Sequence, residues 1–253
     1  MFKTASTQPN RPSEGAAPAI ELQGVRLKRG NTQVFENLNL ALREPRIGLI
    51  GDNGSGKSSL FRLICGLDLP QAGQVRVGGD APQLNGKNAR VVGMMFQNPD
   101  EQIIFPTVEE ELALGVHAAG VPRREAQTQV RAWLAARGLA AWAERAIGGL
   151  SQGQRQHVCW LALLIAAPRV LLLDEPFASL DLPGQALLQR EIDQASQQVM
   201  VSTHVLEHVR GFERVIWLDQ GQVRADGPGR EVCAAYEADV SRRTQAVLLG
   251  DVG

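Results

Sequence analysis

Short apolar runs alternate along this chain with apolar residues at helical spacing. The continuous runs predict buried strands at residues 46–50, 170–173 and 199–201, because a strand covered on both faces of a parallel sheet has no polar alternation. The helical spacings lie at residues 57–66, 151–167 and 184–197. Strands that alternate with helices in this way are typical of an α/β fold.

The start of the chain has a different pattern from this core. Residues 1–18 are rich in Pro, Ser, Thr and Ala and lack the apolar stretch of a secretory signal, which predicts a disordered extension. Residues 20–42 read as strands and turns, with a hairpin tip at Lys28–Asn31. Further strands are expected at 74–77 and 91–96, and a closing hairpin at 215–225.

Residues 98–147 show helical patterns only, and we interpret them as a helical insert in the α/β core. Thr107 and Glu110 have the spacing of a capping box, in which each side chain binds the backbone of the other. Apolar residues at helical spacing predict a second helix from Pro122 to Arg137. After Pro228 the pattern predicts only a short helix near residues 231–238 and a thin tail.

Composition narrows the function classes. The chain has 253 residues, 44% of them hydrophobic, and a formal net charge of −1. This near-neutral charge offers no global electrostatic case for nucleic-acid binding, which needs a basic surface. Three scattered cysteines provide neither a disulfide framework nor a zinc site and favour a reducing compartment. The longest apolar stretch is Val158–Ala167, too short to cross a bilayer, which takes ~18 residues. Any role at a membrane therefore depends on partners.

A glycine-rich loop between the strand at 46–50 and the next helix carries the strongest chemical signal. Gly51–Ser58 has the pattern G-x-x-x-x-G-K-S, in which backbone N–H groups at a helix start cradle phosphate oxygens. Lys57 adds a positive charge near the β- and γ-phosphates, and Ser58 offers its hydroxyl to Mg²⁺. The predicted nucleotide-binding residues are Gly51, Asp52, Asn53, Gly54, Ser55, Gly56, Lys57, Ser58 and Ser59.

Two acidic residues end the buried strand at 170–173. The carboxyl edge of an open α/β sheet is where ligands bind, so Asp174 is expected to hold Mg²⁺ through its water shell. Glu175 is placed to orient the attacking water as general base. The alternative interpretation is that these residues are two solvated acids at a strand end. The phosphate loop in the same chain makes the catalytic interpretation the stronger of the two.

Leu150–Gln154 narrows the choice among phosphate-loop enzymes. Ser151 and Gln154 fit a simple capping box, and a serine-capped helix start is also an anion site. With this segment before the acid pair, residues 20–227 resemble ATP-binding-cassette (ABC) ATPases. The resemblance implies a P-loop NTPase with a RecA-like core, an antiparallel β-subdomain and a helical subdomain. The ATPase domain then spans residues 19–228, followed by a short helical tail at 229–253.

The resemblance also assigns roles to particular residues. Gln97 looks like the family's Q-loop glutamine, Asp181 like its D-loop aspartate and His204 like its switch histidine. In this family two subunits sandwich two ATP molecules, and each phosphate loop faces the signature of the other chain. The matching residues are Ser151, Gln152, Gly153 and Gln154 for the trans signature, Glu175, His204 and Gln97 for catalysis, and Ser58, Gln97 and Asp174 for Mg²⁺.

Two positions depart from the common pattern. Gln152 stands where glycine is commonest in the signature, although Gly153 is kept. Arg29 occupies the position where many relatives stack an aromatic ring on adenine. An arginine can stack on a π-face, and it can equally be a solvated residue at a hairpin tip.

A more specific resemblance comes from Phe96–Gln102 and Phe105–Glu110. These segments are similar to ATPases of energy-coupling factor (ECF) importers, and the segments Arg46–Asn53 and Pro176–Asp181 look most like the biotin group. Cobalt, nickel or another vitamin is the alternative cargo. The resemblance implies a homodimer, or a heterodimer with a related ATPase, bound to a transmembrane coupling subunit and a membrane substrate-binding subunit. It also implies a peripheral location on the cytoplasmic face of the cell (inner) membrane.

Ile103–Phe105 directly follows the Gln97 segment, and two interpretations remain. These apolar residues line a groove for the coupling subunit, or they pack inside the helical insert. A soluble ABC ATPase is a weaker alternative function, because the chain has neither a long coiled-coil insert nor a second cassette. A small-molecule kinase or GTPase leaves the Ser151 segment unexplained, and no Asn-Lys-x-Asp guanine motif occurs.

Overall fold

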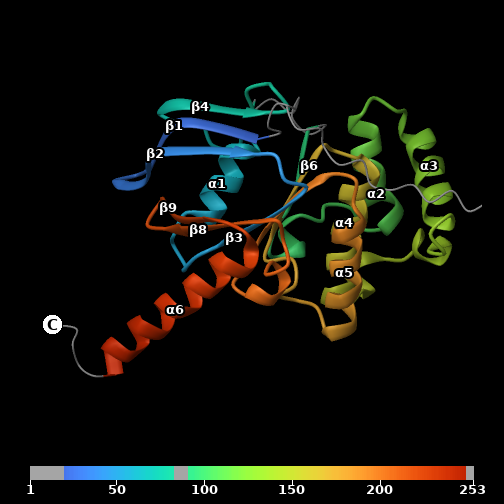
Figure 1. Ribbon diagram of the computed structural model, residues 1–253. Coiled ribbons are helices and arrows are strands. Elements are labelled where there is room, and N and C mark those ends of the chain that lie inside the picture. Colours follow the sequence, from blue (N-terminus) through green and yellow to red (C-terminus); the bar gives the residue numbers. More distant parts are fainter. Residues whose placement is uncertain (1–19, 83–90, 249–253) are drawn as a thin grey trace, which may run out of the picture.

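The computed structural model describes residues 20–82 and 91–248. The disordered extension predicted for residues 1–18 lies outside the described residues. Within them the chain forms two sheets with helices packed around them (Figure 1). The predicted α/β class is confirmed.

The smaller sheet is antiparallel and has the strand order β2-β1-β4. It consists of β1 (Ile20–Arg29), β2 (Thr32–Leu42) and β4 (Ala72–Val77). The predicted hairpin tip is present, because Arg29 pairs with Thr32 across the turn.

The larger sheet has six strands in the order β5-β6-β7-β3-β8-β9. Its strands are β3 (Arg46–Ile50), β5 (Val92–Met95), β6 (Val170–Asp174), β7 (Gln198–Ser202), β8 (Arg214–Asp219) and β9 (Gln222–Gly227). All neighbours are parallel except β8 and β9. Ser202 pairs with Leu49 on one side and with Asp174 on the other. The carboxyl ends of β3, β6 and β7 therefore meet at one edge, where the predicted site residues follow.

Both faces of the larger sheet are buried. Val170 and Leu172 face a core shared with the small sheet and α1 (Lys57–Ile64), and α1 lies between the two sheets in Figure 1. Leu171 and Leu173 face the opposite core, formed with the helices α4 (Gln152–Ala166) and α5 (Leu182–Gln194). This two-sided burial explains why β6 has no polar residue before Asp174.

The elements between β5 and α4 are all helical, and those after η2 share a third apolar core with α4. They are η2 (Pro99–Glu101), α2 (Val108–Ala118), α3 (Arg123–Ala135), η3 (Ala140–Trp142) and η4 (Ile147–Gly149). The capping box predicted at Thr107 is only half formed. The Glu110 N–H donates to the Thr107 hydroxyl at 3.4 Å, but the Glu110 carboxylate accepts from that same hydroxyl at 2.8 Å. It is Glu111 that accepts from backbone N–H groups, those of Ile104 and Phe105.

The C-terminal part is longer and more ordered than its sequence pattern indicates. After η5 (Leu206–His208) and the β8–β9 hairpin, α6 runs from Gly229 to Leu248, where a helix ending near residue 238 was predicted. Few apolar residues recur at helical spacing in the second half of α6. Polar contacts hold this part of the helix in place, and such contacts do not require apolar residues. None of the helices in the described part of the chain is long and apolar enough to cross a membrane.

Candidate functional site

The phosphate loop connects β3 to α1 at the edge described above. Lys57 Nζ donates to the carbonyl oxygens of Gly51 at 2.7 Å and Asp52 at 3.0 Å, so the lysine closes the loop on itself. Gly56 precedes α1 at φ 110° and offers no side-chain cap to the helix N–H groups. These N–H groups therefore remain available to an anion at the helix N-terminus.

Close packing beneath the loop requires glycine at two positions. A Cβ on Gly51, at φ 143°, would lie 2.1 Å from the Leu218 carbonyl oxygen of β8. A Cβ on Gly221, in the β8–β9 turn, would lie 1.7 Å from the Val34 carbonyl oxygen of β2. The Gly221 N–H also donates to the Ser55 carbonyl at 3.0 Å. The β8–β9 turn thus packs closely against β2 and binds the phosphate loop through this hydrogen bond.

Two oxygen groups meet beside the loop in the place expected for a divalent cation. The Ser58 hydroxyl donates to Asp174 Oδ2 at 3.0 Å. Burial raises the pKa of Asp174 above its ordinary value, an effect that the hydrogen bond from Ser58 opposes. Burial likewise lowers the pKa of Lys57. Both shifts have the same cause, since the site is partly withdrawn from water.

Glu175 and His204 come together from neighbouring strands. His204 Nδ1 lies 2.9 Å from Glu175 Oε2, and the Glu175 side chain is 13% exposed whereas that of His204 is 69% exposed. Glu175 has φ 48°, a left-handed conformation that is uncommon for a residue with a side chain. Its N–H is held by the Ser202 carbonyl at 2.9 Å. The Glu175 carboxylate is therefore fixed at the carboxyl edge of the sheet, whereas the His204 imidazole is exposed.

These groups line one cavity of about 820 Å³. Gln97, Asp174, Glu175 and His204 border it together with the phosphate loop, as the sequence predicts. The structure adds lining residues that sequence reasoning missed: Thr32, Gln33, Val34, Gln220, Gly221 and Tyr236. Residues 219–222 lie in the closing hairpin that the sequence predicts at 215–225. Tyr236 belongs to α6, which is longer than the sequence pattern predicts. Nothing in the local sequence pattern connects residues 219–222 or Tyr236 with the phosphate loop, which lies far away in the sequence.

Arg29 does not line this cavity within the described residues. Its guanidinium instead pairs with Asp68 at 2.5 Å, and Asp68 also binds Arg62 at 3.0 Å. The residues of β2 that border the cavity begin at Thr32, just beyond the hairpin tip. An adenine contact by Arg29 therefore stays a prediction.

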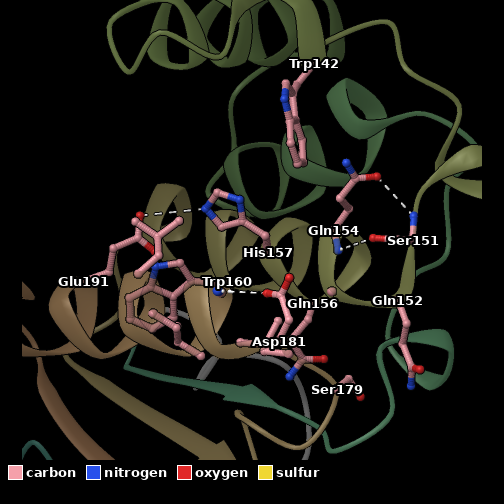
Figure 2. Close-up of a pocket in the computed structure, with 15 residues that line it drawn as sticks. Trp142, Ser151, Gln152, Gln154, Gln156, His157, Trp160, Ser179, Asp181 and Glu191 are labelled. Carbon is pink, nitrogen blue, oxygen red and sulfur yellow. Dashed lines mark hydrogen bonds and ion pairs between the residues drawn. The ribbon is translucent and has the colours of Figure 1, made fainter.

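The Ser151 segment lies away from the phosphate loop of its own chain. Its capping box is complete, because the Gln154 N–H donates to Ser151 Oγ at 3.2 Å and the Ser151 N–H to Gln154 Oε1 at 3.1 Å. The segment borders a second cavity of about 600 Å³ with Asp181 and Trp160 (Figure 2). Asp181 itself caps α5 through the Gly184 N–H. The structure thus separates the two predicted halves of the ATP site, as required if they meet only between two chains.

Comparison with known proteins identifies the class. Residues 35–178 match the ABC transporter family, and the chain therefore belongs to this family of ATP-binding, ATP-hydrolysing transport subunits. The fold is also that of an ATP-binding cassette, MJ0796, solved as a post-hydrolysis dimer with ADP and phosphate. The TM-score is 0.70 at 25% identity, over 83% of this chain and 98% of that one.

More specific likenesses come from sequence. The chain is 44% identical, over 90% of its length and 98% of the relative's, to the biotin transport ATP-binding protein BioM of Rhodobacter capsulatus. It is 32% identical to the energy-coupling factor transporter ATP-binding protein EcfA1 of Enterococcus faecalis, over 87% of this chain and 83% of that one. A structure of cbiO1 from Clostridium perfringens shares the fold, with TM-score 0.75 at 23% identity over 94% and 99% of the two chains. The resemblance to ECF-type and biotin-transport ATPases is confirmed.

Proposed function

We propose that this chain is the ATP-hydrolysing subunit of an ECF-type importer and that the cargo is biotin. The observation that carries the proposal is a phosphate loop, a Ser58–Asp174 pair and a Glu175–His204 pair on one cavity of an ABC transporter subunit. Similarity over almost the full length of a biotin transport ATP-binding protein supports the cargo. The cbiO1 likeness shows the fold alone at 23% identity and carries no argument about the cargo. Cobalt, nickel or another vitamin stays the alternative cargo.

The residues divide the hydrolytic work among themselves. The loop N–H groups and Lys57 bind the triphosphate, and Glu175 orients the attacking water and accepts its proton. His204, held by Glu175 and exposed toward the cavity, contacts the γ-phosphate. Ser58, Asp174 and Gln97 offer the hard oxygen donors that suit Mg²⁺, which supplies charge neutralisation when bound.

The second half of the site comes from another chain. Ser151 and the N-terminus of α4 lie outside the phosphate cavity of their own chain and offer donors for an anion. In a homodimer, or a heterodimer with a related ATPase, they face the γ-phosphate that the partner's loop holds. Transition-state charge is then completed between chains, and hydrolysis reopens the pair.

Membrane partners convert this closure into transport. The chain sits on the cytoplasmic face of the cell (inner) membrane through a transmembrane coupling subunit, which works with a membrane substrate-binding subunit. Ile104 is 72% exposed, which supports a docking role for this residue. Ile103 instead packs against two of the apolar cores, as the alternative interpretation of this segment expects. Uptake of labelled biotin by cells that depend on this chain tests the cargo. Uptake of cobalt or nickel without biotin uptake would contradict it.

The substitution Glu175→Gln tests the chemistry. The amide keeps the shape of the side chain but accepts no proton, so we expect MgATP binding close to that of the unmodified chain and turnover reduced at least ~100-fold. A nucleotide-bound dimer should accumulate in size-exclusion chromatography. Turnover at the unmodified rate would remove Glu175 from the role of general base.

A further inference from the structure

One residue of the phosphate loop carries a negative charge. Asp52, the second residue of the Gly51–Ser58 loop, lies where the proposed ligand is itself a polyanion. Its backbone carbonyl accepts from Lys57 Nζ at 3.0 Å, so the residue is part of the cradle. The Asp52 side chain is 45% exposed, and a free carboxylate here would weaken triphosphate binding, because like charges at close range repel each other even where water screens them.

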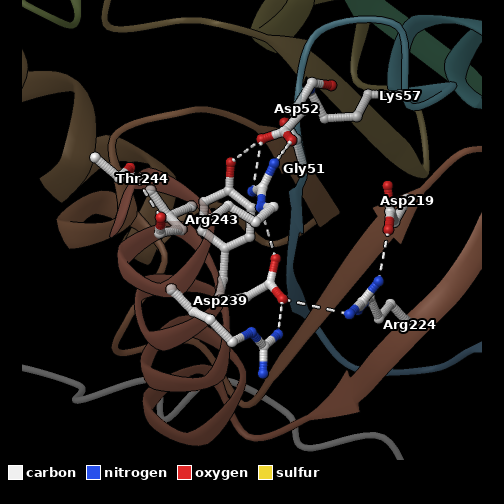
Figure 3. A network of polar contacts seen from close by, with 11 residues as sticks. Gly51, Asp52, Lys57, Asp219, Arg224, Asp239, Arg243 and Thr244 are labelled. Atoms are coloured by element: carbon white, nitrogen blue, oxygen red, sulfur yellow. Dashed lines mark hydrogen bonds and ion pairs between the residues drawn. The ribbon is translucent and has the colours of Figure 1, made fainter. Parts of the chain in front are cut away.

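The C-terminal helix occupies this carboxylate. Tyr236 donates its hydroxyl hydrogen to Asp52 Oδ1 at 2.6 Å, and Arg243 Nη1 donates to Asp52 Oδ2 at 2.6 Å. Figure 3 shows the Asp52 side chain directed toward Arg243 of α6, whereas Lys57 lies on the other side of the loop. The hydrogen bonds from Arg243 and then Tyr236 lower the pKa of Asp52, so the group is ionised and its charge is matched by the arginine.

The two α6 residues are themselves held in place. Arg243 Nε contacts Asp239 Oδ2 at 2.8 Å, and the Asp239 side chain is only 7% exposed. Asp239 also binds Arg242 and, at 3.3 Å, Arg224 of β9. The Tyr236 ring packs edge-to-face on Trp217 of β8 with centroids 5.2 Å apart. The donors to Asp52 are therefore built into the junction of α6 with the sheet.

From this geometry we infer that Arg243 and Tyr236 are positioning residues of the nucleotide site. They hold the Asp52 carboxylate away from the phosphate cradle and neutralise it, so that α6 sets the affinity for nucleotide without touching the phosphates. The inference rests on the proposed function, because it takes a nucleoside triphosphate as the ligand. It assigns the second half of α6 a task beyond packing.

The test is the dissociation constant of MgATP for the full chain. Arg243→Met removes the arginine charge and its hydrogen bonds from the Asp52 carboxylate, and we expect the Kd and the KM to rise about three- to tenfold with kcat unchanged. Asp52→Asn in the same chain removes the charge as well, and the double variant should return to within about twofold of the unmodified Kd. Arg243→Lys keeps the charge and should stay near the unmodified value.

Arg242→Met is the matched control. This neighbour on α6 binds Asp239 but makes no contact with Asp52 in the described residues, so its Kd should stay unchanged. Equal losses in Arg242→Met and Arg243→Met, an unaltered Kd in Arg243→Met, or no recovery in the double variant would each overturn the inference. Failure of the unmodified chain to bind MgATP would instead overturn the proposed function. Thermal unfolding of each variant establishes that it is folded.

Discussion

At the scale of single residues, the site depends on how closely backbones approach one another. The phosphate loop lies directly on β8, and the β8–β9 turn lies directly under β2, each through a glycine whose Cβ would overlap a carbonyl oxygen. The sequence motif accounts for Gly51, because the motif requires it. It could not account for Gly221, whose role comes from a contact between segments far apart in the chain.

The substitution Gly221→Ala tests this contact. Gly221 has φ +76° and would place its Cβ 1.7 Å from the Val34 carbonyl, whereas Gly30 has φ +57° and nothing within 4 Å. Gly30→Ala therefore measures the left-handed backbone cost alone, about 1–2 kcal/mol. We expect Gly221→Ala to cost ~2–4 kcal/mol in unfolding free energy and to weaken MgATP binding, because the turn holds Ser55. If denaturant unfolding gives the same loss of unfolding free energy for Gly221→Ala and Gly30→Ala, the turn accommodates the added Cβ without further cost.

At the scale of elements, apolar periodicity predicted the buried strands and the helices that pack on them. β6 and α4 follow their patterns because their apolar residues are buried in one of the cores. The second half of α6 was missed for the opposite reason: arginine–aspartate contacts with β9 and the phosphate loop hold it, and such contacts leave no period in a sequence. Glu110 was likewise expected to cap a backbone N–H, but it binds the Thr107 hydroxyl.

The exposed segment after η2 carries the element-scale prediction. Ile104 is 72% exposed, whereas Phe105 lines a small cavity and its N–H is bound by Glu111. Ile104→Glu is therefore the cleaner probe of docking, because Phe105→Glu also disturbs packing. We expect Ile104→Glu to lose co-purification with the membrane subunits, by at least about tenfold, while ATP binding persists. Leu69→Glu, at a residue 56% exposed elsewhere, serves as control. Co-purification at the control level would place the docking surface elsewhere.

At the scale of the whole molecule, the two proposed halves of the ATP site border separate cavities of one chain. The phosphate cavity and the Ser151 segment share no lining residue among the described residues. Sequence predicted this separation only through resemblance to a family, since neither motif alone says whether its partner lies in the same chain. The separate linings of the two cavities in the single chain are consistent with this prediction.

Mixing two inactive variants tests the shared site. Lys57→Ala removes the phosphate-loop lysine and Ser151→Ala the signature hydroxyl, and each homodimer should be inactive. A mixed dimer contains one site with both changes and one site with neither. Random pairing makes half of the dimers mixed, so we expect recovery up to about a quarter of the unmodified ATPase rate. If activity does not recover when mixed dimers are shown to form, the half-sites do not complement one another in trans.

The support that α6 and the β8–β9 turn give to the phosphate loop has a consequence for synthesis of the chain. Gly51–Ser58 is synthesised well before Gly221, Tyr236 and Arg243, which contact the loop in the folded chain. Because domains fold as their segments become available, the nascent polypeptide cannot complete its nucleotide cradle until these three residues have emerged from the ribosome. Products truncated before Gly221 would then lack these supports and bind ATP more weakly than the intact chain.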